Sequence, residues 1–198
     1  VWVNLGMPGG VLAFVGLWAI PFLRDAHGLE RDTAALYTGV GLAGFAGGAL
    51  LFGWISDRLR RRKPPLVAGA LLYGLAWLGI VGWTPGGAGM LWFALLGFGA
   101  GAFVLTFAGA KEVVAPAVAG MAIALVNTGA FQGAALLQPL LGWMMDSTWS
   151  GAVANGVRVY GAADYRAGFG PMLAGAALAV LASLFFRETR CRNLAAGD

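Results

Sequence analysis

Uncharged polar side chains gather in one apolar stretch, residues 117–145, and are the best candidates in the chain for contact with a solute. They are Asn127, Thr128, Gln132 and Gln138. At 100° per residue, Asn127, Phe131 and Gln138 fall on nearly one face of a helix, and the other two lie beside it. Amides and hydroxyls at this spacing either bond neighbouring helices together or line a water-filled path, and both interpretations remain open.

Two other apolar stretches add candidates for the same path. Residues 88–110 contain Trp92, Phe103 and Thr106, and residues 1–23 contain Trp18. Aromatic side chains in such stretches either pack against neighbouring helices or contact a ligand. Weaker candidates of the same kind are Asn4, Tyr37 and Tyr73.

Catalytic and metal-binding groups are missing from these stretches. All nine acids and 13 bases lie in the predicted loops, at segment ends or in the tail. The single histidine, His27, follows Asp25 closely in a loop, where we expect a solvated surface residue, and Cys191 is a tail thiol. The sequence therefore predicts neither an enzyme, a metal site, a cofactor nor a proton relay buried in the membrane.

The densest charge in the chain is a hairpin, residues 53–63, which reads Gly-Trp-Ile-Ser-Asp-Arg-Leu-Arg-Arg-Arg-Lys. It contains one acid and five bases between two long apolar stretches. A charged residue at the centre of a membrane helix costs roughly 2.5–3.5 kcal/mol, so this hairpin must lie in water.

The composition indicates a membrane protein. Of the 198 residues, 59% are hydrophobic and 11% are charged, and the mean hydropathy is +0.76. Soluble domains contain about 25% charged residues, and a chain of this size could not bury so much apolar surface in a soluble core. The net charge of +4 does not indicate nucleic-acid binding, because the bases cluster at segment ends rather than along a stripe.

Six apolar segments approach the length of about 20 residues that a bilayer requires. We therefore predict an all-α membrane protein of six transmembrane helices in one domain, residues 1–198. The expected helices are 1–23, 33–55, 65–83, 88–110, 117–145 and 165–186, followed by a cytoplasmic tail, 187–198. Because the chain begins Val1-Trp2 within an apolar segment, we expect it to be part of a longer protein.

Positive charge predicts the orientation. Nine of the 13 bases fall on one predicted side and four on the other. The nine are Arg58, Arg60, Arg61, Arg62, Lys63, Lys111, Arg187, Arg190 and Arg192, and the four are Arg24, Arg31, Arg158 and Arg166. Loops rich in Lys and Arg remain in the cytoplasm, so both ends of the chain and the 53–63 hairpin are expected there.

Three of the predicted helices contain Gly-x-x-x-Gly pairs, namely Gly44/Gly48, Gly97/Gly101 and Gly129/Gly133. This spacing places two glycines on one helix face, where two backbones can approach closely. Glycine is frequent in the chain, with 33 copies, so chance pairs and hinges remain alternatives.

The hairpin also resembles a family signature. Gly53, Asp57, Arg58, Arg61 and Arg62 match the loop motif G-x-x-x-D-R-x-G-R-R of the major facilitator superfamily, and Arg60 replaces the second glycine. In that family the motif lies between the second and third helices of a six-helix half. The tail Arg187–Asn193 and the stretch Gly120–Asp146 resemble the last helices of bacterial members, so the chain resembles a C-terminal half, helices seven to twelve.

The resemblance implies a secondary transporter that works by alternating access, with six-helix halves built as 3+3 inverted repeats. A small polar solute is the implied substrate, with H⁺ or Na⁺ as candidate coupling ions. The implied partners are a missing N-terminal half and membrane lipid, in a bacterial cytoplasmic membrane. The first, second, fourth and fifth helices would line the central cavity, which favours Asn127, Gln132 and Thr106 as path residues.

The loop motif implies a conformational latch. Asp57 would dock on the positive N-terminus of a helix in the other half, with Arg58 and Arg61 orienting its carboxylate. Alternatively, the basic loop only sets the topology. A non-transporting six-helix sensor or assembly subunit is the competing function.

Overall fold

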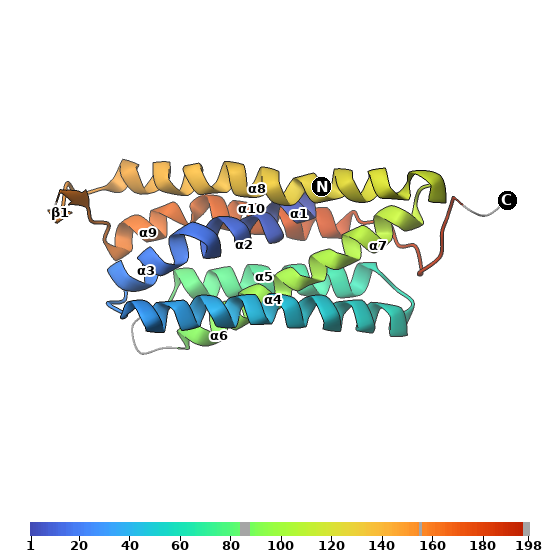
Figure 1. The fold of residues 1–198 in the computed structure, drawn as a ribbon, viewed down its shortest axis with the longest axis horizontal. Helices are drawn as coiled ribbons and strands as arrows, with labels where there is room; N and C mark the ends of the chain where they lie inside the picture. Colours follow the sequence, from blue (N-terminus) through green and yellow to red (C-terminus); the bar gives the residue numbers. More distant parts are fainter. Residues whose placement is uncertain (84–87, 155, 196–198) are drawn as a thin grey trace.

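The computed structural model describes residues 1–83, 88–154 and 156–195. Within them, six helical spans are long and apolar enough to cross a membrane. Figure 1 shows them running side by side along the length of the molecule. The predicted six-helix, almost entirely α-helical membrane fold is therefore confirmed.

The first span, Trp2–Asp25, is built from four helical pieces. They are α1 (Trp2–Gly6), α2 (Pro8–Ala13), the π-helical turn η1 (Phe14–Trp18) and α3 (Ala19–Asp25). The interruption after Gly6 has a local cause, because Pro8 lacks an N–H and restricts the preceding residue.

The next two spans are continuous. Helix α4 extends over Arg31–Leu59 and α5 over Lys63–Val81, with prolines in the first turn of α5. A proline is tolerated there because its missing N–H would have no partner within the helix. Helix α4 is longer at both ends than the predicted segment 33–55, and its last residues carry the charged hairpin.

The fourth and fifth spans contain short 3₁₀ segments. α6 (Gly89–Ala100), η2 (Gly101–Phe103) and α7 (Val104–Glu112) form one rod, and η3 (Pro116–Val118) leads into α8 (Ala119–Thr148). Helix α8 contains Pro139.

The sixth span consists of α9 (Ala162–Gly168) and α10 (Gly170–Leu184). Before it, β1 (Val153–Ala154) pairs antiparallel with β2 (Val157–Arg158), a hairpin that the sequence did not predict.

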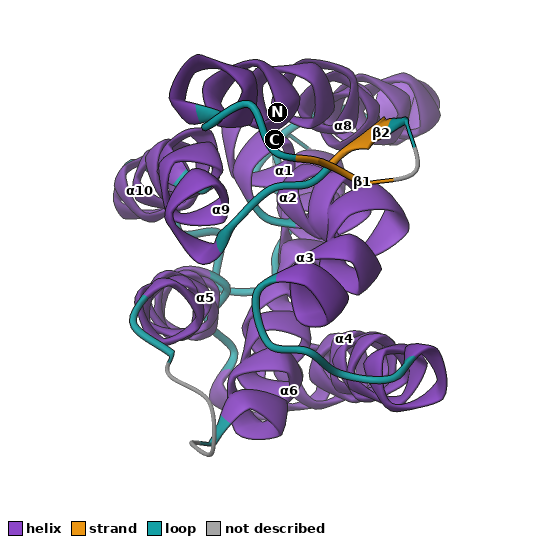
Figure 2. Cartoon of the chain, turned by 90° about the vertical axis from the view of Figure 1, so that its left-hand side faces the viewer, coloured by secondary structure: helices purple, strands orange, loops and turns teal. Residues whose placement is uncertain are grey.

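Figures 1 and 2 show how the helices are arranged. Helices α4 and α8 form two opposite edges of the bundle, and the first span and α7 lie between them on one face. Helices α5 and α10 lie toward the other face. Only 22% of the apolar window in each of α4 and α8 is buried, against 61% in the first span. Few residues of the two edge helices are therefore buried within the bundle.

An aromatic cluster fills the centre of the core. The Phe14 ring lies 4.9 Å from that of Trp77, 5.6 Å from Phe93 and 5.5 Å from Phe169, measured between centroids. These four residues come from the first, third, fourth and sixth spans and are fully buried. Aromatic pairs at such separations stabilise a core beyond the area they bury.

All three Gly-x-x-x-Gly pairs lie in close helix contacts, as the spacing predicts. A methyl group at Gly44 or Gly48 would meet the backbone of α6, and one at Gly97 would collide with the Gly41 carbonyl of α4. The pair Gly129/Gly133 contacts the first span in the same way. These glycines allow the backbones to touch.

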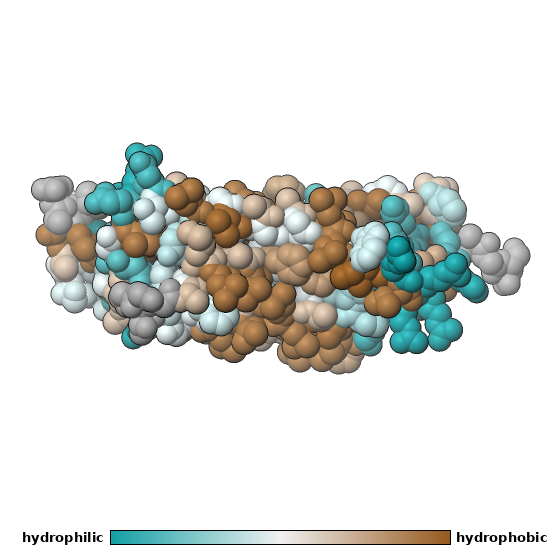
Figure 3. All heavy atoms as spheres, turned by 90° about the horizontal axis from the view of Figure 1, so that it is seen from below, coloured by the Kyte–Doolittle hydropathy of each residue, from teal (hydrophilic) through white to brown (hydrophobic). Residues whose placement is uncertain are grey.

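The surface is banded. Figure 3 shows hydrophobic residues across the middle of one face and hydrophilic residues at both ends. This distribution matches a bundle that is surrounded by hydrocarbon between two aqueous layers.

Candidate functional site

A buried polar pair joins the first and fourth spans. Asn4 is fully buried and Thr106 nearly so, and Thr106 Oγ1 lies 2.9 Å from Asn4 Oδ1. Asn4 Nδ2 donates to the Val126 carbonyl of α8 at 3.1 Å. Thr106, a predicted path residue, therefore serves an internal contact here, and Asn4, a weaker candidate from the sequence, is its partner.

A second contact joins the first span to α8. Trp18 Nε1 donates to the Gln138 carbonyl at 3.2 Å, and Gln138 Nε2 donates to the Leu12 carbonyl at 3.4 Å. Both residues are half-buried. The structure thus brings together two predicted path residues from different helices.

Aromatic side chains meet where α4 crosses η2 and α7. Phe103 stacks on Phe45 with centroids 5.1 Å apart and meets Phe107 edge-on at 5.3 Å. All three are half-buried, so each keeps part of its ring accessible. Such faces can contact the apolar side of a solute.

The outward face of α8 carries the remaining candidates. Phe131 is 64% exposed, and Thr128 and Gln132 are also exposed, while Asn127 is half-buried. Thr128 donates to the Leu125 carbonyl within its own helix. The Gln132 amide forms no hydrogen bond within the described residues, and an amide left unpaired in hydrocarbon costs several kcal/mol. This face therefore requires water or another polar surface beside it.

Trp92 lies in a packing position. Its indole ring fills the space beside Gly79 of α5, where a methyl group would collide with it. This position matches the packing interpretation of Trp92.

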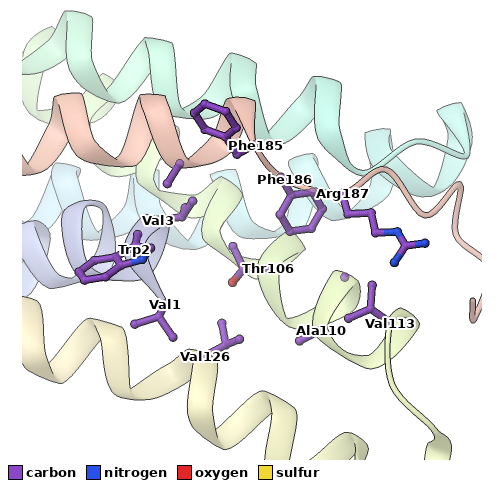
Figure 4. A pocket seen from close by; sticks show the side chains of 12 residues that line it. Val1, Trp2, Val3, Thr106, Ala110, Val113, Val126, Phe185, Phe186 and Arg187 are labelled. Carbon is purple, nitrogen blue, oxygen red and sulfur yellow. The ribbon is translucent and has the colours of Figure 1, made fainter. Parts of the chain in front are cut away.

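A cavity of about 310 Å³ opens beside the Asn4–Thr106 pair. Figure 4 shows Val1 and Val126 on one side of Thr106, and Phe186 and Arg187 on the other. Its lining is largely apolar and includes Val1, Trp2 and Val3 at the start of the first span. Because its lining offers few polar groups, we assign it no solute.

The loop motif forms a charged network at what we call the basic end of the bundle, where residues 57–63 lie. Arg62 is buried, with Nη1 2.6 Å from Asp57 Oδ1 and Nη2 2.7 Å from Glu112 Oε1. Burial lowers the pKa of Arg62, but hydrogen bonds to Glu112 and Asp57 outweigh it and raise the pKa above its ordinary value. Arg62 therefore orients Asp57, the role that the resemblance gave to Arg58 and Arg61.

The tail completes this network. Glu188 accepts hydrogen bonds from the backbone N–H groups of Arg62 and Lys63 at 2.9 and 3.1 Å, at the start of α5. Thr189 donates to Glu112. Burial raises the pKa of Glu188, but the backbone donors outweigh it and hold the pKa below its ordinary value. A carboxylate at a helix N-terminus is stabilised by the unpaired N–H groups there.

The turn that closes the motif forms without its glycine. Arg60 adopts a left-handed conformation, with φ 48° and ψ 40°. Gly53 has open space around it, and Arg61 is exposed. The guanidinium of Arg58 lies 5.1 Å from the centroid of the Trp54 ring.

At the opposite end, His27 differs from the solvated residue that we expected. Its ring stacks on Trp83 with centroids 3.8 Å apart and meets Phe22 edge-on at 4.9 Å. Nδ1 is buried without a partner among the described residues. Burial and the nearby charge of Arg166 lower the pKa of His27.

Within the described residues, no group of His, Cys, Asp and Glu could hold a metal ion.

Comparison with known proteins agrees with this architecture. The family model of the Major Facilitator Superfamily matches residues 6–195. Among solved structures, the inward-open xylose transporter XylE from E. coli superposes with a TM-score of 0.68 at 17% identity, over 95% of this chain and 46% of that one. This likeness shows the fold, and the chain spans less than half of that transporter's length. No curated protein sequence matches. A match over nearly the whole chain, on a bundle of six membrane-length helices, shows that this chain is an integral membrane protein of the major facilitator superfamily.

Proposed function

We propose that this chain is the C-terminal half, helices seven to twelve, of a secondary transporter that moves a small polar solute by alternating access. The observation that carries this proposal is the exposed polar face of α8, where the Gln132 amide has no partner among the described residues. Family membership favours a transporter over the alternative of a sensor or assembly subunit.

An N-terminal half of six helices is the proposed partner. Few residues in the apolar windows of α4 and α8 are buried, and these two helices flank the face that contains the first span and α7 (Figure 1). A second bundle placed against that face would cover both edges and enclose a path between the halves. Two bundles that rock about such a path give alternating access.

The proposed path combines residues from three helices. They are Trp18 and Gln138 at the contact of the first span with α8, the outward residues of α8, and Phe103. The outward residues are Asn127, Thr128, Phe131 and Gln132. The sequence places no charged residue in this wall, so recognition of a charged solute or a coupling ion, H⁺ or Na⁺, falls to the other half.

We further propose that Asp57 forms a latch. Its side chain is 69% exposed although it is paired with Arg62, so one face of the carboxylate stays available to a helix N-terminus in the other half. In return, the start of the fifth span would receive an acid from that half. The excess of bases at this end supports a cytoplasmic location for it, in a bacterial cytoplasmic membrane.

Transport by the full-length protein tests the path. In proteoliposomes with imposed H⁺ or Na⁺ gradients, Gln132→Leu should reduce solute uptake about tenfold or more, because an amide that binds the solute is lost. Ser183→Ala on α10, whose hydroxyl bonds to its own helix, is the matched control and should leave uptake unchanged. Equal uptake by Gln132→Leu and wild type would show that the outward face of α8 does not line the solute path.

The latch has a separate test. Because the proposed latch favours the outward-open state, Asp57→Asn should shift the protein toward the inward-open state. A distance between spin labels placed on the two halves measures this shift. An unchanged distance distribution and unchanged uptake would rule out the latch.

A further inference from the structure

Three exposed arginines close to the end of α4 have no role in the network described above. Arg58, Arg60 and Arg61 are all exposed, and none forms an ion pair with a described residue. Figure 3 shows a hydrophilic cluster at this end of the bundle, next to the hydrophobic band.

The acids at this end are already engaged. Asp57 and Glu112 are both paired with Arg62, and Glu188 accepts hydrogen bonds from the start of α5. No other acid of the described chain lies in this loop or in the tail. The three exposed arginines therefore have no ion-pair partner among the described residues and leave this surface positively charged.

One stripe of α4 leads from apolar surface to this charge. Leu50, Trp54 and Arg58 are spaced four residues apart, so they lie one above another on the helix. Leu50 is 78% exposed and Trp54 is 56% exposed, and the Arg58 guanidinium lies over the Trp54 ring. The order along the stripe is hydrocarbon, amphipathic ring and cation, which is also the order of acyl chain, glycerol backbone and phosphate in a phospholipid.

We propose that Trp54 and Arg58 form a binding site for an anionic phospholipid, with Arg60 and Arg61 adding positive potential around it. The Arg58 guanidinium would pair with two oxygens of the phosphodiester, a geometry that suits its planar fork. The Trp54 indole would lie at the level of the glycerol esters, and Leu50 would contact the acyl chain. The site requires that the bundle spans a bilayer and that this stripe of α4 faces lipid rather than the proposed N-terminal half.

The phosphate chemistry is shared with free phosphate esters, but the apolar stripe favours the lipid. A free anion gains nothing from Leu50 or from the exposed ring of Trp54. A lipid buries both, and its acyl chains hold the headgroup beside Arg58. The occupant is therefore a lipid of the leaflet that surrounds the basic end, such as phosphatidylglycerol.

Thermal unfolding of the full-length protein in detergent tests this site. Added phosphatidylglycerol should raise the unfolding temperature in a saturable way, whereas phosphatidylcholine, which has no net charge, should do so much less. One arginine near a membrane surface contributes about fivefold to binding of an anionic lipid, so Arg58→Gln should raise the half-saturating concentration by about that factor. Arg58→Lys, which keeps the charge but loses the fork, should fall between, and Trp54→Leu should also weaken binding.

Arg31→Gln is the matched control, because Arg31 is exposed at the other end of the same helix. It should respond to phosphatidylglycerol as the wild type does. The proposal is overturned if Arg58→Gln and Trp54→Leu both respond like the wild type, or if the two lipids stabilise the wild type equally. It is also overturned if free glycerol phosphate reproduces the effect, because the site would then bind an anion without lipid.

Discussion

The guanidinium of Arg62 lies 2.7 Å from the carboxylate of Glu112, although 50 residues separate them in the sequence. Their side chains are 11% and 14% exposed, so the pair is largely shielded from water. Through Asp57 and Thr189, the same two residues connect the end of α4, the end of α7 and the tail.

Arg62→Gln should destabilise the bundle by about 2–3 kcal/mol, because it leaves the Glu112 carboxylate shielded and unpaired. Chemical unfolding in detergent measures this change. Arg61→Gln, at an exposed neighbour, should change the free energy of unfolding by less than about 0.5 kcal/mol. Similar losses for the two variants would contradict the structural role of Arg62.

The Glu188 contact predicts a dependence on pH. The pKa of Glu188 is held below its ordinary value of 4.5 by backbone donors. Its contribution to stability is therefore complete above pH 4.5 and is lost as the pH falls through the lower, folded-state pKa. Glu188→Gln should flatten the acid limb of a stability-against-pH curve, and a limb of unchanged slope would argue against the contact.

Arg60→Gly should stabilise the protein by about 0.5–1 kcal/mol. A residue with a side chain pays a steric cost in the left-handed conformation, and glycine does not, although glycine loses more backbone entropy on folding. Arg58→Gly, which lies within α4, should instead destabilise by about 1 kcal/mol. The opposite signs of the two glycine substitutions, read as unfolding midpoints, check the turn geometry.

Gly97→Ala should destabilise the α4–α6 contact by about 1–3 kcal/mol, because the added methyl group would collide with the Gly41 carbonyl. Gly74→Ala on α5 is the control, since its methyl group would meet nothing nearer than Val180 Cγ2 at 3.8 Å. Equal unfolding temperatures for the two variants would show that the helices are not held this closely.

A double-mutant cycle tests the buried polar pair. Asn4→Ala and Thr106→Val each remove one side of the 2.9 Å contact, and the coupling between them should be about 0.6–1.7 kcal/mol. Additive losses of unfolding free energy would mean that the two side chains do not interact.

Much of the fold follows from local patterns. Apolar length alone predicts six spans, and the Gly-x-x-x-Gly spacing marks backbone contacts because both glycines must lie on one face of one helix. The helix that each pair contacts depends on the tertiary fold, and the spacing within one helix cannot predict it.

The contacts of the candidate site could not be predicted from local sequence patterns. Asn4 and Thr106 are 102 residues apart, and Arg62 and Glu188 are separated by 126. No local sequence pattern predicts that these residues form hydrogen bonds with each other. His27 was expected in solvent because of its polar loop, but stacking on Trp83 leaves it half-buried. The sequence shows that Arg60 replaces a glycine of the motif. It does not show that Arg60 still adopts the left-handed conformation of the turn.

The π-helical turn η1 in the first span has a consequence for comparing related sequences. A π-turn holds one residue more than the α-helical turn it replaces, so every side chain from Ala19 to Asp25 is rotated by about 100° relative to an uninterrupted helix. Trp18, the last residue of the turn itself, donates to the Gln138 carbonyl. An alignment with a relative that lacks the insertion needs a one-residue gap here, and without that gap it would match the wrong residue to Trp18. Gain or loss of a single residue at this turn is thus a way for evolution to exchange the side chain facing α8 while the ends of the helix stay in place.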